Sequence, residues 1–155
     1  MRHTGESNRP DFVRALSEHT ETLLASVRAY YAFDGIRFEA ERARGAIQQL
    51  LEAPALGEAW LIRDGAEFVG HFVLSFGFDI EFGGRQATLT ELYLDEHARG
   101  RGFGSAALGF VQERLTTLGI RTLELQAEDD NLEAQRFYQR AGFVAETRIA
   151  FTKRW

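Results

Sequence analysis

The sequence contains no cysteine, only two prolines and a single methionine in 155 residues. The absence of cysteine excludes disulfides and thiolate metal sites, and it is compatible with a reducing compartment. No apolar run approaches the roughly 20 residues that a membrane-spanning helix needs, and the N-terminus lacks the apolar core of a signal peptide. We therefore expect a cytoplasmic protein without a membrane partner.

Basic charge is also scarce, because 18 Lys and Arg against 23 Asp and Glu give a net charge of −5 and a pI of about 5.4. Proteins that bind nucleic acid usually present a strongly basic face, so we expect no nucleic-acid partner. Negative charge suits a cationic small molecule, although solubility alone also explains it. The length predicts one domain over residues 11–155, preceded by a flexible polar leader over residues 1–10.

Hydrophobic periodicity predicts a mixed α/β sheet in one domain, with elements in the order β, α, α, β, β, β, α, β, α, β. The first helix is expected to begin at Ser17 as its N-cap, and the other helices cover about residues 38–51, 104–118 and 131–140. The expected strands cover 12–16, 59–62, 68–74, 87–94 and 122–126, with one or two more in 143–152. Residues 77–85 are expected to form a loop.

Between the expected strand 87–94 and the helix after it, glycines and arginines alternate in the segment Arg99-Gly100-Arg101-Gly102-Phe103-Gly104-Ser105. Glycine lets the backbone approach a ligand closely. The N–H groups of a first helical turn, together with the helix dipole, bind phosphate. The two arginines add guanidinium donors for phosphate oxygens. A glycine-capped loop with solvated arginines is the structural alternative.

Other ligand motifs are absent or misplaced. There is no Gly-Lys-Ser/Thr, so a Walker A loop is excluded. Residues 102–107 fit the dinucleotide fingerprint Gly-x-Gly-x-x-Ala, but only about 50 residues follow, too few for the remaining βα units of that fold. His71 and His97 are interpreted as an ordinary strand residue and a loop residue. No histidine pair has metal-ligand spacing, so no metal site is expected.

At the glycine loop, Arg99 to Ser105, the chain resembles the GNAT superfamily of acyl-CoA-dependent N-acyltransferases. The family's cofactor motif, Gln/Arg-x-x-Gly-x-Gly/Ala, is matched by Arg99, Gly102 and Gly104. The segment Asn131-x-x-Ala134-x-x-Phe137-Tyr138-x-x-x-Gly142-Phe143 is similar to a second family segment. The resemblance covers about residues 58–150. It implies a mostly antiparallel central sheet that splays between its fourth and fifth strands, with about four flanking helices, and homodimers are common in the family.

The resemblance also implies acetyl-CoA as the co-substrate. The pantetheine arm would pair with main-chain groups of Leu92, Tyr93 and Leu94. The loop from Arg99 to Ser105 would hold the pyrophosphate, mainly through amides, and Asn131 would contact the cofactor from the next helix. Tyr138 would lie near the sulfur and donate a proton to the leaving thiolate.

The base that removes a proton from the acceptor amine has two candidates. Where the family uses a carboxylate, it often stands on the strand before the glycine loop, at positions that are Thr88 and Thr90 here. Glu91 is the nearest carboxylate, but simple alternation points it to the opposite face unless a β-bulge re-aims it. A water that relays the proton is the other candidate.

In related folds the first two helices and the loop before the fourth strand line the acceptor pocket. Rings and carboxylates that suit a cationic amine occur there, at Tyr31, Asp34, Phe78 and Glu81, although such aromatics also pack in cores. The expected function is acetyl transfer from acetyl-CoA to a primary amine of a small cationic molecule. The alternatives are acetylation of a protein N-terminus or lysine, and a non-catalytic acyl-CoA-binding module.

Overall fold

The computed structural model describes residues 9–155, so the predicted leader lies largely outside the described residues. One five-stranded sheet has the order β1-β2-β3-β4-β5. The strands are β1 Asp11–Arg14, β2 Gly57–Asp64, β3 Glu67–Asp79, β4 Gly84–Leu94 and β5 Leu123–Leu125. The first four strands pair antiparallel, and β5 pairs parallel with β4. The predicted mixed sheet is confirmed.

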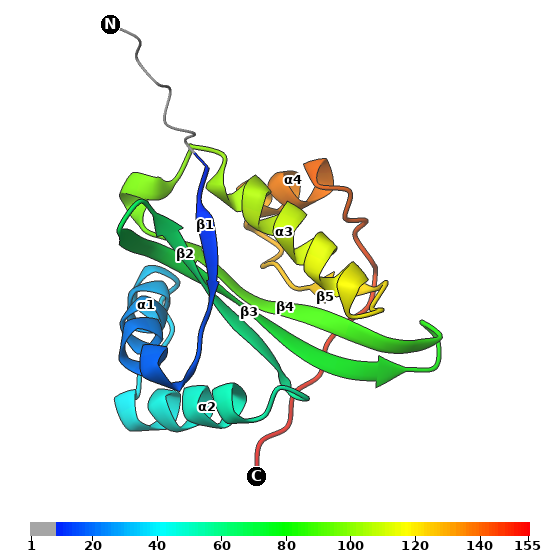
Figure 1. Cartoon of the computed structure of the whole chain (residues 1–155). Coiled ribbons are helices and arrows are strands. Elements are labelled where there is room, and N and C mark those ends of the chain that lie inside the picture. The colour runs from blue at the N-terminus through cyan, green and yellow to red at the C-terminus, as the bar shows by residue number, and fades with distance from the viewer. Residues whose placement is uncertain (1–8) are drawn as a thin grey trace, which may run out of the picture.

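Helices cover both faces of the sheet (Figure 1). The helices α1 Thr20–Phe33 and α2 Ala40–Glu52 pack on one face, around a cluster that includes Leu23, Val27 and Leu61. On the other face, the helix α3 Phe103–Thr117 packs over a larger cluster that includes Phe72, and α4 Leu132–Arg140 borders it. Within residues 9–155, every helix is too short or too polar to cross a bilayer.

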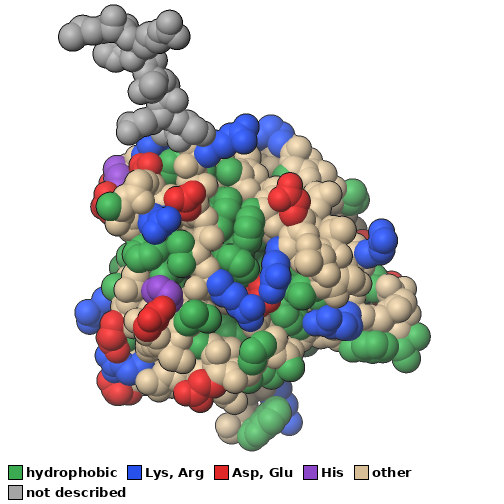
Figure 2. All heavy atoms as spheres, viewed as in Figure 1, with side chains coloured by type: hydrophobic (Ala, Val, Ile, Leu, Met, Phe, Trp, Pro, Cys, Tyr) green, Lys and Arg blue, Asp and Glu red, His purple; other side chains and the backbone are tan. Residues whose placement is uncertain are grey.

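The sequence signals that predicted α3 are visible in its packing. Leu108, Val111 and Leu115 recur at helical spacing and are buried against the sheet. Gly119 follows the helix with φ of 73°, a left-handed conformation that glycine adopts without strain. In the view of Figure 2, hydrophobic side chains gather in a band across the middle of the molecule, and charged side chains surround it.

The two longest strands, β3 and β4, each contain one residue more than the paired stretch of the strand before them, which forms a β-bulge. On β3, Ile62 faces Gly70 and Arg63 faces Phe68, which leaves Val69 as a bulge. On β4, Val73 faces Glu91 and Leu74 faces Leu89, so Thr90 is the extra residue. A bulge of this kind reverses the faces to which the following side chains point. The second bulge determines the orientation of Glu91.

The prediction that Ser17 caps the first helix is wrong. Residues Ser17–His19 form a short 3-10 turn, and α1 begins at Thr20. The Leu16 N–H donates to His19 Nδ1 at 3.0 Å, and the Thr20 hydroxyl donates to the Ser17 carbonyl at 2.8 Å. Because these bonds close the turn without the Ser17 side chain, the regular helix has its N-cap at His19, two residues later than predicted.

Two further predictions are corrected. Residues 77–85 are mostly strand, because β3 and β4 stay paired as far as Asp79 and Gly84, and only four residues form the connecting turn. The strands expected in residues 143–152 are absent. Alternating apolar residues provide two faces, but a strand also needs a partner backbone, and β5 spans only three residues. As a result, Ile149 and Phe151 are exposed.

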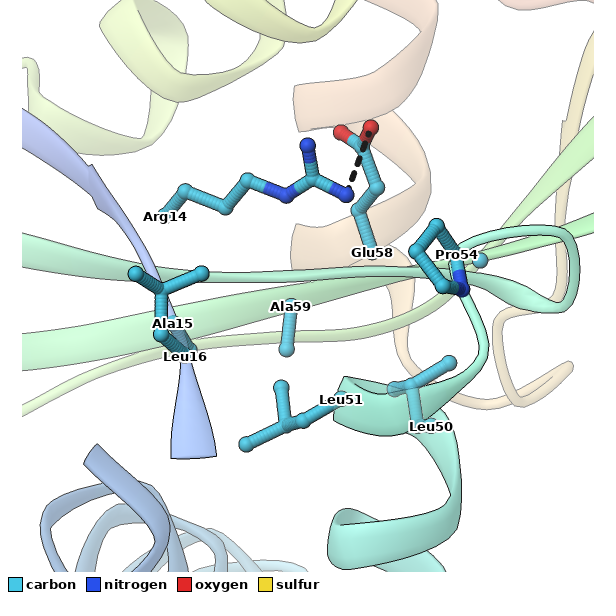
Figure 3. Close-up of a pocket in the computed structure, with 9 residues that line it drawn as sticks. Arg14, Ala15, Leu16, Leu50, Leu51, Pro54, Glu58 and Ala59 are labelled. Atoms are coloured by element: carbon cyan, nitrogen blue, oxygen red, sulfur yellow. Dashed lines mark ion pairs between the residues drawn. The ribbon is translucent and has the colours of Figure 1, made fainter. Parts of the chain in front are cut away.

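A buried carboxylate on β2, on the side of the sheet far from β5, forms an ion pair with α3. The Glu58 side chain is only 3% exposed and accepts hydrogen bonds from Arg114 at 2.6 and 3.0 Å and from Trp60 Nε1 at 2.9 Å. Arg14 lies 3.4 Å away, beside a cavity of about 210 Å³ lined by Leu50, Leu51 and Pro54 (Figure 3). Burial raises the pKa of Glu58, but these donors outweigh burial and leave the pKa below its ordinary value.

We predict that Glu58→Gln lowers the melting temperature by about 4–8 °C, because roughly 2 kcal/mol is lost when Arg114 loses its charged partner. The matched control is Glu67→Gln, an exposed position on β3. Since the folded-state pKa is depressed, the contribution of Glu58 is full above pH of about 4.5 and is lost as the pH falls through the lower folded value. The melting temperatures of wild type and Glu58→Gln should therefore converge as the solution is acidified. A gap between them that stays constant below pH 4 would contradict this account.

Candidate active site

The glycine loop connects β4 to α3 through the short 3-10 turn Glu96–Ala98. Gly100 and Gly102 have φ of 70° and 81°, which side-chain-bearing residues rarely adopt, and a Cβ added at either one would meet no heavy atom within 4 Å. Gly102 is the N-cap of α3, and no side chain of the described residues caps it. The N–H groups of Phe103, Gly104 and Ser105 precede the helical bond from the Ala106 N–H to the Gly102 carbonyl, and free N–H groups at a helix N-terminus suit an anion.

Both arginines of the loop have protein partners. Arg99 Nε donates to the Leu94 carbonyl at 2.8 Å, and its guanidinium lies 4.1 Å from the ring centre of Phe33. Arg101 donates to Asp64 at 2.8 Å and lies 4.5 Å from the ring centre of Phe103. These contacts hold positive charge on both sides of the glycine turn. A role of either arginine toward phosphate stays a prediction.

Gly104 lies where the first turn of α3 packs against α4. A Cβ at this position would stand 3.1 Å from Phe137 Cζ, closer than side chains normally pack. Phe137 itself packs against the core under α3. Asn131 begins α4, and its side chain accepts the Ala134 N–H at 3.1 Å. Both motif segments thus meet at one end of the sheet, while contact between Asn131 and a cofactor stays a prediction.

The sheet diverges beside the glycine loop. The last pair between the parallel strands is Leu89 with Leu125, and β4 continues to Leu94 paired only with β3 (Figure 1). Leu92, Tyr93 and Leu94 lie in this continuation. Because β5 has ended, the main-chain groups on this edge of β4 lack ladder partners; the Leu94 carbonyl accepts Arg99 Nε, and the remaining groups on the edge can bind an extended ligand.

The bulge at Thr90 turns Glu91 toward α1. Glu91 Oε2 lies 2.7 Å from His71 Nε2, and Glu91 Oε1 lies 3.4 Å from the Tyr31 hydroxyl. His71 Nδ1 in turn lies 2.6 Å from Ser26 Oγ. The Glu91 side chain is 16% exposed and His71 is completely buried. The interpretation of His71 as an ordinary strand residue missed this network, because no local pattern links residues 20 to 60 positions apart.

Two phenol groups of α1, those of Tyr30 and Tyr31, lie near Glu91. Burial raises the pKa of Tyr30 to about 12, and Asp34, Glu91, Tyr31 and Tyr138 add to the shift. Burial also raises the pKa of Tyr31, with a further contribution from Glu91. The pKa of Tyr138 is raised by burial alone. All three phenols therefore keep their protons at neutral pH, and Tyr138 of α4 interacts electrostatically with Tyr30 of α1.

The four predicted acceptor residues fall into two groups. Tyr31 and Asp34 lie at the C-terminal end of α1, close to the Glu91 network. Phe78 lies seven residues beyond His71 on β3, roughly 23 Å along the strand, and its side chain is exposed. Glu81 lies in the turn after it and pairs with Arg148. The long β3–β4 hairpin thus separates Phe78 and Glu81 from Tyr31 and Asp34.

Comparison with known proteins identifies the family to which this fold and site belong. The model of the Acetyltransferase (GNAT) family matches residues 18–143, so the chain belongs to the GNAT acetyltransferase family. The comparison with curated proteins finds no match.

Solved structures share the fold. An integron cassette protein from the mobile metagenome of Cole Harbour Salt Marsh is 31% identical, with a TM-score of 0.82 over 92% of this chain and 89% of that chain. The aminoglycoside N-acetyltransferase AAC(6')-Iy in complex with CoA is 16% identical, with a TM-score of 0.83 over 97% and 98% of the two chains. A ribosomal-protein-alanine N-acetyltransferase from Brucella melitensis biovar Abortus 2308 is 16% identical, with a TM-score of 0.76 over 94% and 99%.

We predict that Gly104→Val abolishes the rise in melting temperature that coenzyme A causes. The added side chain would displace Phe137 and the first turn of α3. The matched control is Gly109→Val on the same helix, where a Cβ meets nothing within 4 Å. Wild type and the control should gain about 5–10 °C at a hundredfold excess over Kd, because the ligand binds only the folded state. A full shift in Gly104→Val would refute the placement of the pyrophosphate at this turn.

Proposed function

We propose that the protein transfers the acetyl group of acetyl-CoA directly to a primary amine of a small cationic molecule. The observation that carries the proposal is the bulge at Thr90, which presents the Glu91 carboxylate to the α1 side of the sheet. The phenol groups of Tyr30 and Tyr31 lie close to Glu91 there. Glu91 stands on the strand that leaves β5, next to the stretch proposed for the donor.

The glycine loop supports acetyl-CoA as the donor. Amides from Gly100 to Ser105 surround a turn that is open at Gly100 and Gly102, and this geometry fits a pyrophosphate. The main chain of Leu92–Leu94 offers hydrogen bonds to a pantetheine arm beside it. When bound, acetyl-CoA supplies a thioester whose acetyl carbonyl accepts an amine. A structural neighbour in complex with CoA supports the same assignment.

Two side chains account for the proton transfers. Glu91 Oε1 takes the proton that the amine must lose before or during attack on the acetyl carbonyl. Tyr138 gives its hydroxyl proton to the departing sulfur, and its raised pKa keeps that proton in place at neutral pH. An amide at Leu92–Leu94 stabilises the negative charge that develops on the carbonyl oxygen.

The surroundings of Glu91 favour a cationic acceptor. The carboxylates of Asp34 and Glu91 and the ring faces of Tyr30 and Tyr31 attract an ammonium group. Two of the structural neighbours are aminoglycoside acetyltransferases, and an aminoglycoside is an acceptor of this cationic class. Phe78 and Glu81 would contact only an acceptor that reaches the distal part of the β3–β4 hairpin.

We predict release of free thiol from acetyl-CoA in the presence of polyamines or aminoglycosides. Glu91→Gln should lower kcat by about a hundredfold, because a general base contributes that much or more. Glu113→Gln, an exposed substitution on α3, is the matched control. An unchanged kcat in Glu91→Gln would assign the proton to water rather than to this carboxylate.

The same assay tests a second candidate function, acetylation of a protein N-terminus or lysine. The neighbour named as a ribosomal-protein-alanine N-acetyltransferase favours including it. Peptides with a free N-terminal alanine or an internal lysine are therefore assayed beside the small amines. Turnover of a peptide alone would replace the small-molecule acceptor. Coenzyme A binding without thiol release for any amine would indicate a non-catalytic module.

We predict that Tyr138→Phe lowers kcat by about ten- to a hundredfold while the coenzyme A-dependent rise in melting temperature stays unchanged. The substitution removes only the hydroxyl and keeps the ring contacts with Phe137 and Phe143. Because burial raises the pKa of Tyr138 above 10.0, wild-type activity should not fall from loss of this proton below that pH. Full activity of Tyr138→Phe would remove the acid role.

A further inference from the structure

His71 is completely buried in the middle of β3, yet both ring nitrogens have hydrogen-bond partners. Nε2 faces Glu91 Oε2 at 2.7 Å, across to β4, and Nδ1 faces Ser26 Oγ at 2.6 Å, on α1. A hydrophobic residue would fill this position at lower cost if packing were the only requirement, because burial of a polar ring is unfavourable without partners. The pair of short contacts therefore indicates a specific task for the ring.

The partners determine where the imidazole proton lies. An ionised Glu91 carboxylate only accepts hydrogen bonds, so His71 Nε2 must carry the proton. In the neutral ring Nδ1 is then an acceptor, and the Ser26 hydroxyl donates to it. Ser26 thereby favours the tautomer that can donate to Glu91. Three side chains from α1, β3 and β4 form one directed chain of hydrogen bonds.

This series of hydrogen bonds distinguishes the two oxygens of Glu91. Oε2 is held by His71, whereas Oε1 is 3.4 Å from the Tyr31 hydroxyl, longer than a normal O–H···O bond. We propose that His71 is a positioning residue that holds the Glu91 carboxylate with Oε1 available to the acceptor amine, and that Ser26 sets the tautomer required for this. The inference rests on the role proposed for Glu91.

A proton relay through His71 does not fit the same geometry. Nε2 already carries a proton in the tautomer that donates to Glu91, so a proton taken up by Glu91 cannot enter the ring at the nitrogen that faces it, and the unprotonated Nδ1 faces Ser26 instead. The imidazole therefore orients the carboxylate and does not accept its proton. The other titratable groups around the ring are Tyr30 from α1 and Tyr93 from β4, with ring centres 6.2 and 6.0 Å away; Tyr31, Asp34 and Arg99 lie next to them.

The first test needs no substrate. Nitrogen-15 spectra of the imidazoles in the ligand-free protein report the tautomer of each histidine, and His71→Gln identifies the His71 signals. We expect a neutral Nε2–H tautomer at pH 7 in wild type. Observation of the Nδ1–H tautomer, or of an imidazolium, would overturn the proposal whether or not the protein acetylates amines.

The second test compares donors at position 71. His71→Leu removes the donor that holds Glu91 Oε2 and should lower kcat at least tenfold while leaving KM for acetyl-CoA unchanged. His71→Gln keeps an N–H donor and should recover most of kcat. Ser26→Ala, a milder change if His71→Leu folds poorly, should lower kcat by about threefold.

Glu91→Gln, measured beside these variants, separates the two proposals. An impaired Glu91→Gln together with an unaffected His71→Leu would refute positioning by His71 and keep Glu91 as the base. A Glu91→Gln variant with unchanged kcat would refute the role of Glu91 as the base. If His71→Leu and His71→Gln lower kcat equally, the N–H donor is not what matters, the ring only supports the fold, and the inference is wrong.

Discussion

The extra residue at Thr90 is the constraint on which both sides of the site depend. Side chains alternate along a strand, so one inserted residue exchanges the two faces for everything that follows. Leu89 before the bulge and Leu92 after it both pack in the cluster beneath α3. Glu91 instead points to α1. Without the insertion, the Glu91 carboxylate would enter that apolar cluster and Leu92 would leave it, at a cost in both burial and charge.

In the proposed function β4 contacts both the donor and the acceptor, because its neighbour β5 ends early. β5 pairs with β4 only from Ala87 to Leu89 of β4, so the continuation to Leu94 has one edge without a strand. The glycine turn follows after the 3-10 turn Glu96–Ala98, and Gly104 lies against Phe137 of α4. A donor on this edge and an acceptor on the α1 side would meet at Glu91. The short length of β5 is thus part of the site.

Local patterns in the sequence predicted the glycine loop, α3 and α4, because their determinants lie within one or two helical turns. Glu91 was predicted only conditionally, since a bulge depends on the register with β3 and not on the residues around Thr90. His71 was missed because Ser26 and Glu91 approach it from distant segments. The strands expected after Phe143 failed for a related reason: alternation was present, but no described segment pairs with it.

Two glutamates, Glu58 buried and Glu91 partly buried, show how partners decide what a carboxylate can do. Glu58 accepts hydrogen bonds from Trp60 and the Arg114 guanidinium, with Arg14 close by, so its charge is neutralised and its oxygens are occupied. Among residues 9–155, the groups in contact with Glu91 are an imidazole and a phenol, neither of which carries a fixed positive charge. A proton added to Glu58 would break an ion pair, whereas a proton added to Glu91 Oε1 breaks none. Glu58 therefore stabilises the fold, whereas the contacts of Glu91 are compatible with the role of base that we propose for it.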